Sequence, residues 1–283
     1  ESFQSQLFQD RTHVLAPASI APNGIAEPVG DSFRITGRWQ WATGIWHAEW
    51  VIVGARVESS APVPDLRFFA VPRAECELID TWFVDGLCGT GSHDIELTNV
   101  LVPEERVVSM ADMANGCAHG ARLHSGPLYR TPMIPILGLA ASLPAVGVAR
   151  AAVQELLQEL PTRGTYLGGQ ARVDRTSIQM RLARADLQVR QSEGLLREIV
   201  RELCEVRERA TSKDRARWLA AAAMAVAQSR EALHSLADTA GATSHFLSSP
   251  VQRSVRDVNV IASHMIFDLD MRLESYGRTL LGL

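Results

Sequence analysis

The sequence predicts an α+β fold, in which an antiparallel β-barrel or sandwich domain is followed by a C-terminal four-helix bundle. Short apolar runs separated by Gly, Pro and Asp turns recur between residues 26 and 102, which is typical of antiparallel β structure. Beyond about residue 130 the apolar residues follow a helical period. There is no βαβ alternation and no GxGxxG after a strand, which disfavours a classical dinucleotide fold.

The composition is that of an ordinary globular protein. Of the 283 residues, 46% are hydrophobic and 21% are charged, enough for one or two domains with a substantial core. The formal net charge of −4 argues against nucleic acid as the partner. Four scattered cysteines without a CxxC pair favour a reduced cytoplasmic setting and no metal site. The apolar run at residues 133–148 contains two prolines and is short for a membrane span, so no membrane partner is expected.

Residues 1–120 are expected to form the β domain, with a leading segment and a linker. Pro22, Asn23 and Gly24 predict turns in the leading segment. Five stretches read as strands from alternation or from buried apolar runs: residues 33–36, 50–53, 66–71, 77–83 and 93–102. Residues 109–127 are rich in Gly, Ala, His and Ser and are expected to form a loop.

Residues 121–283 are expected to form the bundle, with helices over about 130–160, 173–209, 214–240 and 250–276. Gly241 is a plausible C-cap of the third helix, and Pro250 begins the last. The second helix has a core face with a period near 3.5 residues. Its members are Ile178, Leu182, Ala185, Val189, Leu196, Ile199 or Val200, and Leu203.

Four of the six tryptophans fall within residues 39–50, on both sides of the turn Ala42-Thr43-Gly44. An aromatic wall around a hydroxyl-bearing turn suits a flat heteroaromatic ligand, because rings stack on it while the turn binds the ligand's polar edge. A tryptophan-rich β core is an equal alternative. The Thr43 hydroxyl either binds a ligand or bonds its own backbone, and both interpretations stay open.

The last helix carries Arg256, Asp257 and His264. Eight residues separate Arg256 from His264, which places them about two turns apart on one side of a continuous helix. An interhelical ion pair is the favoured interpretation of Arg256 and Asp257. His264 has apolar neighbours, so we expect it to be buried, either as a satisfied core residue or as a base beside a ligand.

Together these motifs resemble the acyl-CoA dehydrogenase superfamily over nearly the whole chain, and within it the reduced-flavin-dependent monooxygenases of two-component systems. The motifs are GRWQWATGIWHAEWVIVGA, GLCGTGSHD and VRDVNVIASH. Common acyl-CoA dehydrogenases carry a base glutamate after the Arg-Asp helix start, whereas this sequence has Ala262-Ser263-His264-Met265 there. The resemblance therefore implies oxygen chemistry rather than removal of a thioester α-proton.

The resemblance also implies the site residues. Thr43 matches the Ser/Thr that bonds the flavin ring, and Trp41 is a ring contact. His264 matches the histidine that deprotonates a phenolic substrate or steadies the peroxide formed from oxygen. Weaker matches for flavin contacts are Ser92 near the ring, Arg163 at a phosphate across a subunit boundary, and Gly241 and Thr243 near the cofactor tail.

The implied function is hydroxylation of a small aromatic or phenolic substrate by the oxygenase component of a two-component monooxygenase. Such an enzyme takes reduced flavin, FMN or FAD, from a flavin reductase and is expected to be a cytoplasmic homotetramer. The family has a helical domain before the β domain, so we expect a fragment or a natural short form. A thioester-oxidising flavoenzyme and a non-catalytic self-association module remain the alternatives.

Overall fold

The computed structural model describes residues 2–10, 12–162, 164–165, 169 and 171–283. The chain divides into two compact units. The first comprises Glu1–Val84 and Cys88–Arg130, and the second comprises Asp85–Leu87 and Thr131–Leu283. The change from one unit to the other after Arg130 falls ten residues beyond the boundary expected from the sequence.

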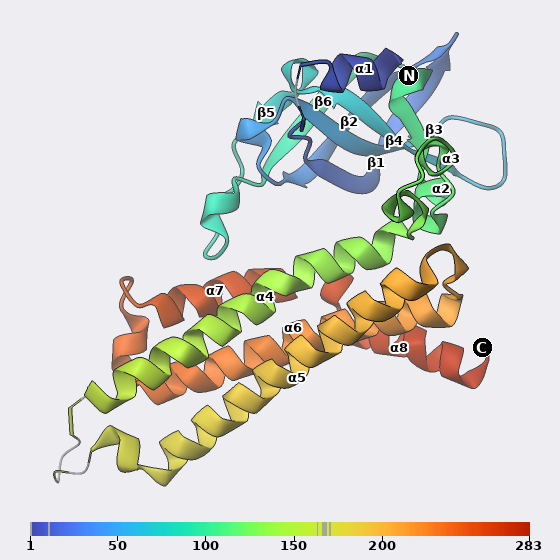
Figure 1. Cartoon of the computed structure of the whole chain (residues 1–283). Helices are drawn as coiled ribbons and strands as arrows, with labels where there is room; N and C mark the ends of the chain where they lie inside the picture. The colour runs from blue at the N-terminus through green and yellow to red at the C-terminus, as the bar shows by residue number, and fades with distance from the viewer. Residues whose placement is uncertain (1, 11, 163, 166–168, 170) are drawn as a thin grey trace. The chain divides into compact units, whose positions relative to one another are not determined.

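A seven-stranded sheet in the order β5-β6-β2-β1-β3-β4-β7 forms the first unit (Figure 1). The strands are β1 (Ala18–Val29), β2 (Ser32–Ala42), β3 (Trp50–Val57), β4 (Asp65–Pro72), β5 (Glu77–Ile79), β6 (His93–Pro103) and β7 (Val107–Ser109). Short helices flank them: α1 (Ser2–Phe8), α2 (Met110–Asn115) and α3 (His119–Leu123). The expected β domain is confirmed, although the described strands form an open sheet ending at β5 and β7.

The sheet is mixed, which corrects the expectation of a purely antiparallel one. β1 pairs antiparallel with β2 but parallel with β3. The β1–β3 register shifts between Ser19 and Gly24, which marks a bulge. Pro22 and Asn23 therefore lie within β1, where the sequence had predicted turns, because a bulge accepts a proline that cannot donate to the ladder.

Trp39 fills the centre of the core of this unit. Its ring is fully buried, and its indole N–H donates to the Gly54 carbonyl at 2.7 Å. Two glycines make room for the ring. A Cβ on Gly24 would lie 2.2 Å from ring atom Cζ2, and one on Gly37 would lie 2.7 Å from the Gly24 Cα atom. These contacts require glycine at both positions.

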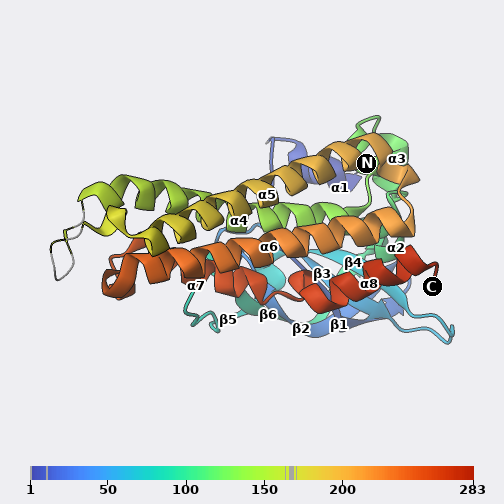
Figure 2. The ribbon, with the colours of Figure 1, turned by 90° about the horizontal axis from the view of Figure 1, so that it is seen from below.

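In the part of the second unit that the structure describes, the expected bundle is formed by five α-helices, one more than the four expected: α4 (Met133–Glu159), α5 (Thr176–Val206), α6 (Ser212–Ala240), α7 (Pro250–Ala262) and α8 (Leu269–Leu281). Helix α6 packs against the other four, and α4, α5 and α6 run side by side (Figures 1 and 2). Its buried alanines, including Ala222, Ala223 and Ala225, allow the close approach that this central place requires.

The predicted core face of α5 is confirmed, with Leu182 only half-buried and Ile199 rather than Val200 in the core. Its buried residues are Ile178, Ala185, Val189, Ser192, Leu196, Ile199 and Leu203. Gly241 caps α6 as predicted, with a φ of 71° that favours glycine.

Helix α4 agrees with the expected helix over about residues 130–160 and extends beyond the apolar run at residues 133–148. It continues through Pro144, and residues 133–162 are long and apolar enough to cross a membrane by length and composition alone. Ala145, Ala149, Val153 and Leu156 are nevertheless buried in the core of the bundle. The core helix of a bundle gives the same signal as a membrane span.

The C-terminal region corrects the expectation of one helix to about residue 276. Helix α7 ends at Ala262, and a 3-10 turn over Met265–Phe267 separates it from α8. The His264 side chain caps this turn, and the Asp268 carboxylate caps α8 by accepting from the Met271 N–H at 3.0 Å. Two capping side chains in five residues begin new helices here, so His264 does not lie on the same helix as Arg256.

Candidate functional site

Three hydroxyl groups form a hydrogen-bonded chain in the first unit. The Thr43 Oγ1 atom lies 2.9 Å from Ser92 Oγ, which lies 2.8 Å from Thr90 Oγ1. Ser92 is buried, whereas Thr43 is exposed. The structure therefore brings two of the predicted site residues together, and it adds Thr90, which the sequence analysis missed although Thr90 stands in the same GTGS motif. A buried partner restrains the outer hydroxyl while leaving it a further hydrogen bond to make.

Backbone contacts hold the segments that carry these hydroxyls. β2 pairs with β6 at Ala42 and His93, and the Gly44 N–H donates to the Thr90 carbonyl at 2.8 Å. Trp41 has a φ of 65°, a conformation that is uncommon for a residue with a Cβ. The Thr43 N–H donates to the Trp41 carbonyl at 2.9 Å, which closes a tight turn. Strained backbone conformations of this kind are frequent at functional sites, where the surrounding structure stabilises them.

The four clustered tryptophans do not form a single wall. Trp39 lies in the hydrophobic core, and Trp50 packs edge-on against Phe3 with ring centroids 5.1 Å apart. Trp41 and Trp46 are 58% and 61% exposed. The β-core interpretation is thus confirmed for Trp39, whereas the ligand-wall interpretation stays a prediction for the outer two rings, which lie on the surface.

His264, in the second unit, is exposed rather than buried as expected. Its Nδ1 atom accepts from the Ile266 N–H at 3.1 Å. Arg272 Nε donates to the Ile266 carbonyl at 2.9 Å. Partial desolvation, and then the charge of Arg272, lower the pKa of His264 below its ordinary value of 6.5. The ring therefore stays neutral at physiological pH. Arg272 has no local sequence signal, and the sequence analysis missed it.

Arg256 and Asp257 bind backbone rather than forming the expected ion pair with another helix. The Arg256 guanidinium donates to the Asp85 carbonyl, and the Asp257 carboxylate accepts from the Leu87 N–H at 2.6 Å. Between them, a Cβ on Gly86 would lie 2.3 Å from the Arg256 carbonyl oxygen. Residues 85–87 are therefore held against α7 by two charged side chains and a close backbone approach.

The weaker predicted contacts have local structural roles. The Thr243 hydroxyl donates to the Ala240 carbonyl at 3.1 Å, and Arg172 donates to the same carbonyl at 3.3 Å. Together with the φ of Gly241, these bonds shape the turn after α6. Arg163 lies outside the described residues.

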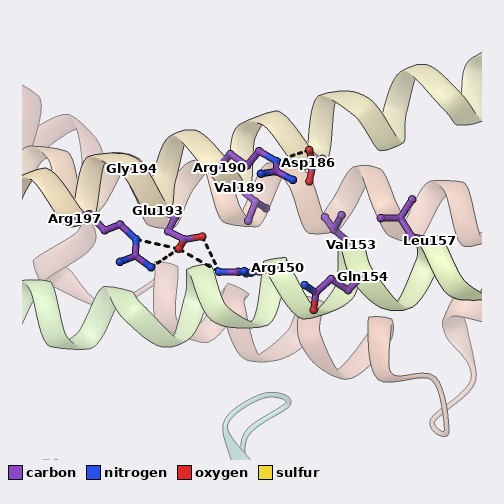
Figure 3. A pocket seen from close by; sticks show the side chains of 10 residues that line it. All are labelled: Arg150, Val153, Gln154, Leu157, Asp186, Val189, Arg190, Glu193, Gly194 and Arg197. Atoms are coloured by element: carbon purple, nitrogen blue, oxygen red, sulfur yellow. Dashed lines mark hydrogen bonds and ion pairs between the residues drawn. The ribbon is translucent and has the colours of Figure 1, made fainter.

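A groove of about 490 Å³ lies between α4 and α5 (Figure 3). Glu193 binds two arginines there, Arg150 at 3.0 Å and Arg197 at 2.7 Å. Arg190 pairs with Asp186 at 2.7 Å. These cations already have carboxylate partners, and the groove contains none of the predicted site residues. Its apolar margin includes Leu157, which is 51% exposed.

Comparison with known proteins identifies the family. The protein-family model described as "Acyl-CoA dehydrogenase, C-terminal domain" matches residues 139–269 of this sequence. A pigment production hydroxylase of Rhodococcus sp. is 33% identical, over all of this chain and 73% of that protein. The chain belongs to the acyl-CoA dehydrogenase superfamily. It falls among the flavin-dependent monooxygenases of that superfamily, because the oxygenase component of an FADH2-dependent resorcinol hydroxylase from Rhizobium sp. is 30% identical, over all of this chain and 72% of that protein.

A solved structure has a similar fold. XiaF from Streptomyces sp., in complex with FADH2 and glycerol, has a TM-score of 0.90 and 26% identity over all of this chain and 72% of that one. The resemblance inferred from the motifs is thereby confirmed, and so is the expected fold class. Thr43 and Trp41, both exposed, stay predicted contacts of the flavin ring.

Proposed function

We propose that this chain is the oxygenase component of a two-component monooxygenase that uses FADH2 and O2 to hydroxylate a phenolic substrate. The observation that carries the proposal is the exposed Thr43 hydroxyl, restrained by buried Ser92 and joined to exposed Trp41 in one strained turn. We favour FADH2 over FMN because the resorcinol hydroxylase is FADH2-dependent and the XiaF structure is a complex with FADH2.

The donor set fits a flavin. An isoalloxazine ring has flat apolar faces and an edge of hydrogen-bonding nitrogen and oxygen atoms, so it needs an aromatic surface beside a directed polar group. Trp41 supplies the surface, and the Thr43 hydroxyl supplies a group that both donates and accepts. Reduced flavin, when bound, supplies the electrons that activate O2.

The chain's own residues have distinct roles in the proposal. Thr43 binds and orients the flavin edge, Ser92 restrains Thr43, and Trp41 covers a ring face and excludes water. His264 acts on the phenolic oxygen of the substrate. A hydroxyl group activates an aromatic ring toward an electrophilic oxygen far more strongly once it carries negative charge, so a group that favours the phenolate raises the rate.

The proposal extends to the cofactor tail. Gly241 and Thr243 would lie near it, and Arg163 would bind a flavin phosphate from a neighbouring subunit. These assignments rest on the motif matches. Thr243→Ala tests them, since a tail contact predicts weaker binding of FADH2 but unchanged binding of lumiflavin, which has no tail.

Reductase-coupled turnover tests the function. With NADH, a flavin reductase and O2, the protein should convert a member of a panel of phenols to a product heavier by one oxygen atom, measured by mass spectrometry. Thr43→Val should lower FADH2 affinity by about tenfold, the loss of one hydrogen bond of about 1.4 kcal/mol. Thr98→Val, at an exposed threonine of β6, is the matched control. Equal affinity in both variants would remove Thr43 from the site.

Thioester oxidation is the alternative enzyme activity. It needs a base, and His264 stands where the sequence would carry the glutamate of an acyl-CoA dehydrogenase. Bleaching of bound oxidised flavin by an acyl-CoA, without any reductase, would favour this alternative. Retention of the flavin colour would favour the monooxygenase.

We also propose that the protein is a cytoplasmic homotetramer, and that the α4–α5 groove faces a second copy. Leu143 lines the neighbouring part of the groove and is 51% exposed, on a helix that is apolar along its length. Leu143→Glu should then dissociate the oligomer in sedimentation experiments. Leu101→Glu, at a leucine that is 54% exposed on β6, is the control. A monomeric parent protein would contradict the proposal.

A further inference from the structure

The turn over residues 264–267 fixes the protonation pattern of one imidazole. His264 Nδ1 accepts a hydrogen bond from the Ile266 N–H at 3.1 Å. A ring nitrogen that accepts a hydrogen bond uses its lone pair and carries no proton. A neutral imidazole has one proton, so this proton is on Nε2. The nitrogen that points away from the turn is therefore a donor.

Arg272 supports this arrangement in two ways. Its Nε atom donates to the Ile266 carbonyl at 2.9 Å, so it holds the same peptide segment whose N–H binds the histidine. Partial burial of the His264 ring, and then the positive charge of Arg272, lower the pKa of His264, which opposes a second proton on the ring. Phe267 is buried and lies edge-on to the imidazole, with 6.3 Å between the ring centroids. It therefore anchors the C-terminal end of the turn in the core.

We infer that Arg272 and the 264–267 turn hold His264 in the Nε2-protonated neutral tautomer, so that His264 donates a hydrogen bond to the substrate oxygen instead of removing its proton. The second half of this inference rests on the proposed function, whereas the tautomer does not. Arg272 is a positioning residue in this scheme, because it acts through His264.

The distinction follows from lone pairs. A base must offer a lone pair, but an Nε2 atom that carries hydrogen has none to offer. To act as a base through Nε2, His264 would have to give up the bond to Ile266 and move its proton to Nδ1. As a donor it acts without rearrangement. A hydrogen bond to an anionic oxygen is stronger than one to a neutral oxygen, so it favours the phenolate, and the phenolic proton passes to solvent water.

The tautomer is tested without flavin or substrate. In protein labelled with 15N-histidine, NMR distinguishes protonated from unprotonated ring nitrogens, and the resonance missing in His264→Gln identifies His264 among the eight histidines. We expect protonated Nε2 and bare Nδ1 at pH 7.5. Arg272→Gln should give a mixture and a higher pKa, Arg272→Lys should keep the pKa low, and Arg278→Gln, also on α8, should match the parent. Protonated Nδ1 in the parent protein would overturn the inference.

Turnover variants then test the chemical role. Glutamine retains an N–H donor but is no base, while glutamate is a base without a donor at neutral pH. A donor role predicts that His264→Gln keeps most of the parent ratio of product to hydrogen peroxide, and that His264→Glu lowers it at least tenfold. The reverse order would establish a base. Equal ratios in both variants and the parent would sink the catalytic role of His264, and with it this part of the proposed function, whatever tautomer NMR finds.

Discussion

Replacing Gly86 by alanine should detach residues 85–87 from α7. The new Cβ would lie 2.3 Å from the Arg256 carbonyl oxygen and 2.9 Å from the Asp257 nitrogen, and both are backbone atoms of a helix that cannot yield. The segment must therefore move outward. In doing so it breaks the bond from the Leu87 N–H to the Asp257 carboxylate and the bond from Arg256 to the Asp85 carbonyl.

The magnitude follows from these two bonds. Each joins a backbone group to a charged side chain, which contributes roughly 1.5–3 kcal/mol, and both side chains are half-exposed, so the lower figure applies. We expect the free energy of unfolding to fall by about 3 kcal/mol. For a unit of this size, that corresponds to a decrease of about 6–12 °C in Tm.

Thermal and denaturant unfolding of Gly86→Ala would measure the loss, with Gly89→Ala as the matched control. A Cβ on Gly89 meets nothing within 4 Å, so the control should stay within about 0.5 kcal/mol of the parent. Hydrogen exchange adds a local measurement, because the Leu87 amide should exchange much faster in Gly86→Ala alone. Equal stability of the two variants, with a protected Leu87 amide in both, would refute the reasoning.

Three further predictions concern the candidate site. Trp39→Ala should cost about 3–5 kcal/mol of stability, whereas Trp41→Ala should cost under about 1 kcal/mol yet weaken FADH2 binding, as measured by unfolding and by titration. Ser92→Ala should leave the Thr43 hydroxyl less restrained and raise the Kd for FADH2 by about five- to tenfold. The unfolded chain should take up a proton on His264 near pH 6.5, and the folded protein should do so only at a lower pH, because the pKa of His264 is lowered on folding. The free energy of unfolding should therefore have its full value above pH 6.5 and decrease below it. This decrease should be smaller in His264→Gln.

The helical period of the apolar residues predicted the bundle, because these residues form the face that each helix buries in the core. The face of α5 from Ile178 to Leu203 could be read directly, since each member meets the core. The end of α7 could not, because Ala262 and His264 continue an acceptable helical pattern and only the caps made by His264 and Asp268 interrupt it. Capping depends on side-chain direction, which a pattern of apolar residues does not contain.

The site was less accessible to sequence reasoning than the fold. Thr43 and Ser92 were each found by motif, yet their contact joins positions 49 apart in the sequence through β2–β6 pairing. The parallel pairing of β1 and β3 was missed because neighbouring strands with turn signals predict hairpins. Arg256 and Asp257 were taken for an ion pair because the backbone groups they bind, around Gly86, are not identifiable by residue type.

The packing of Trp39 against Gly24 and Gly37 constrains how this protein can diverge. Gly24 cannot acquire a side chain while the indole is present, and loss of the indole leaves a cavity that an alanine at Gly24 fills only in part, whereas a Cβ on Gly37 would meet the Gly24 backbone even without the indole. Change at Gly24 or at Trp39 alone is thus unfavourable until the other has changed. Over evolutionary time they should be inherited as a set, and substitutions that are damaging one by one should compensate each other when made together.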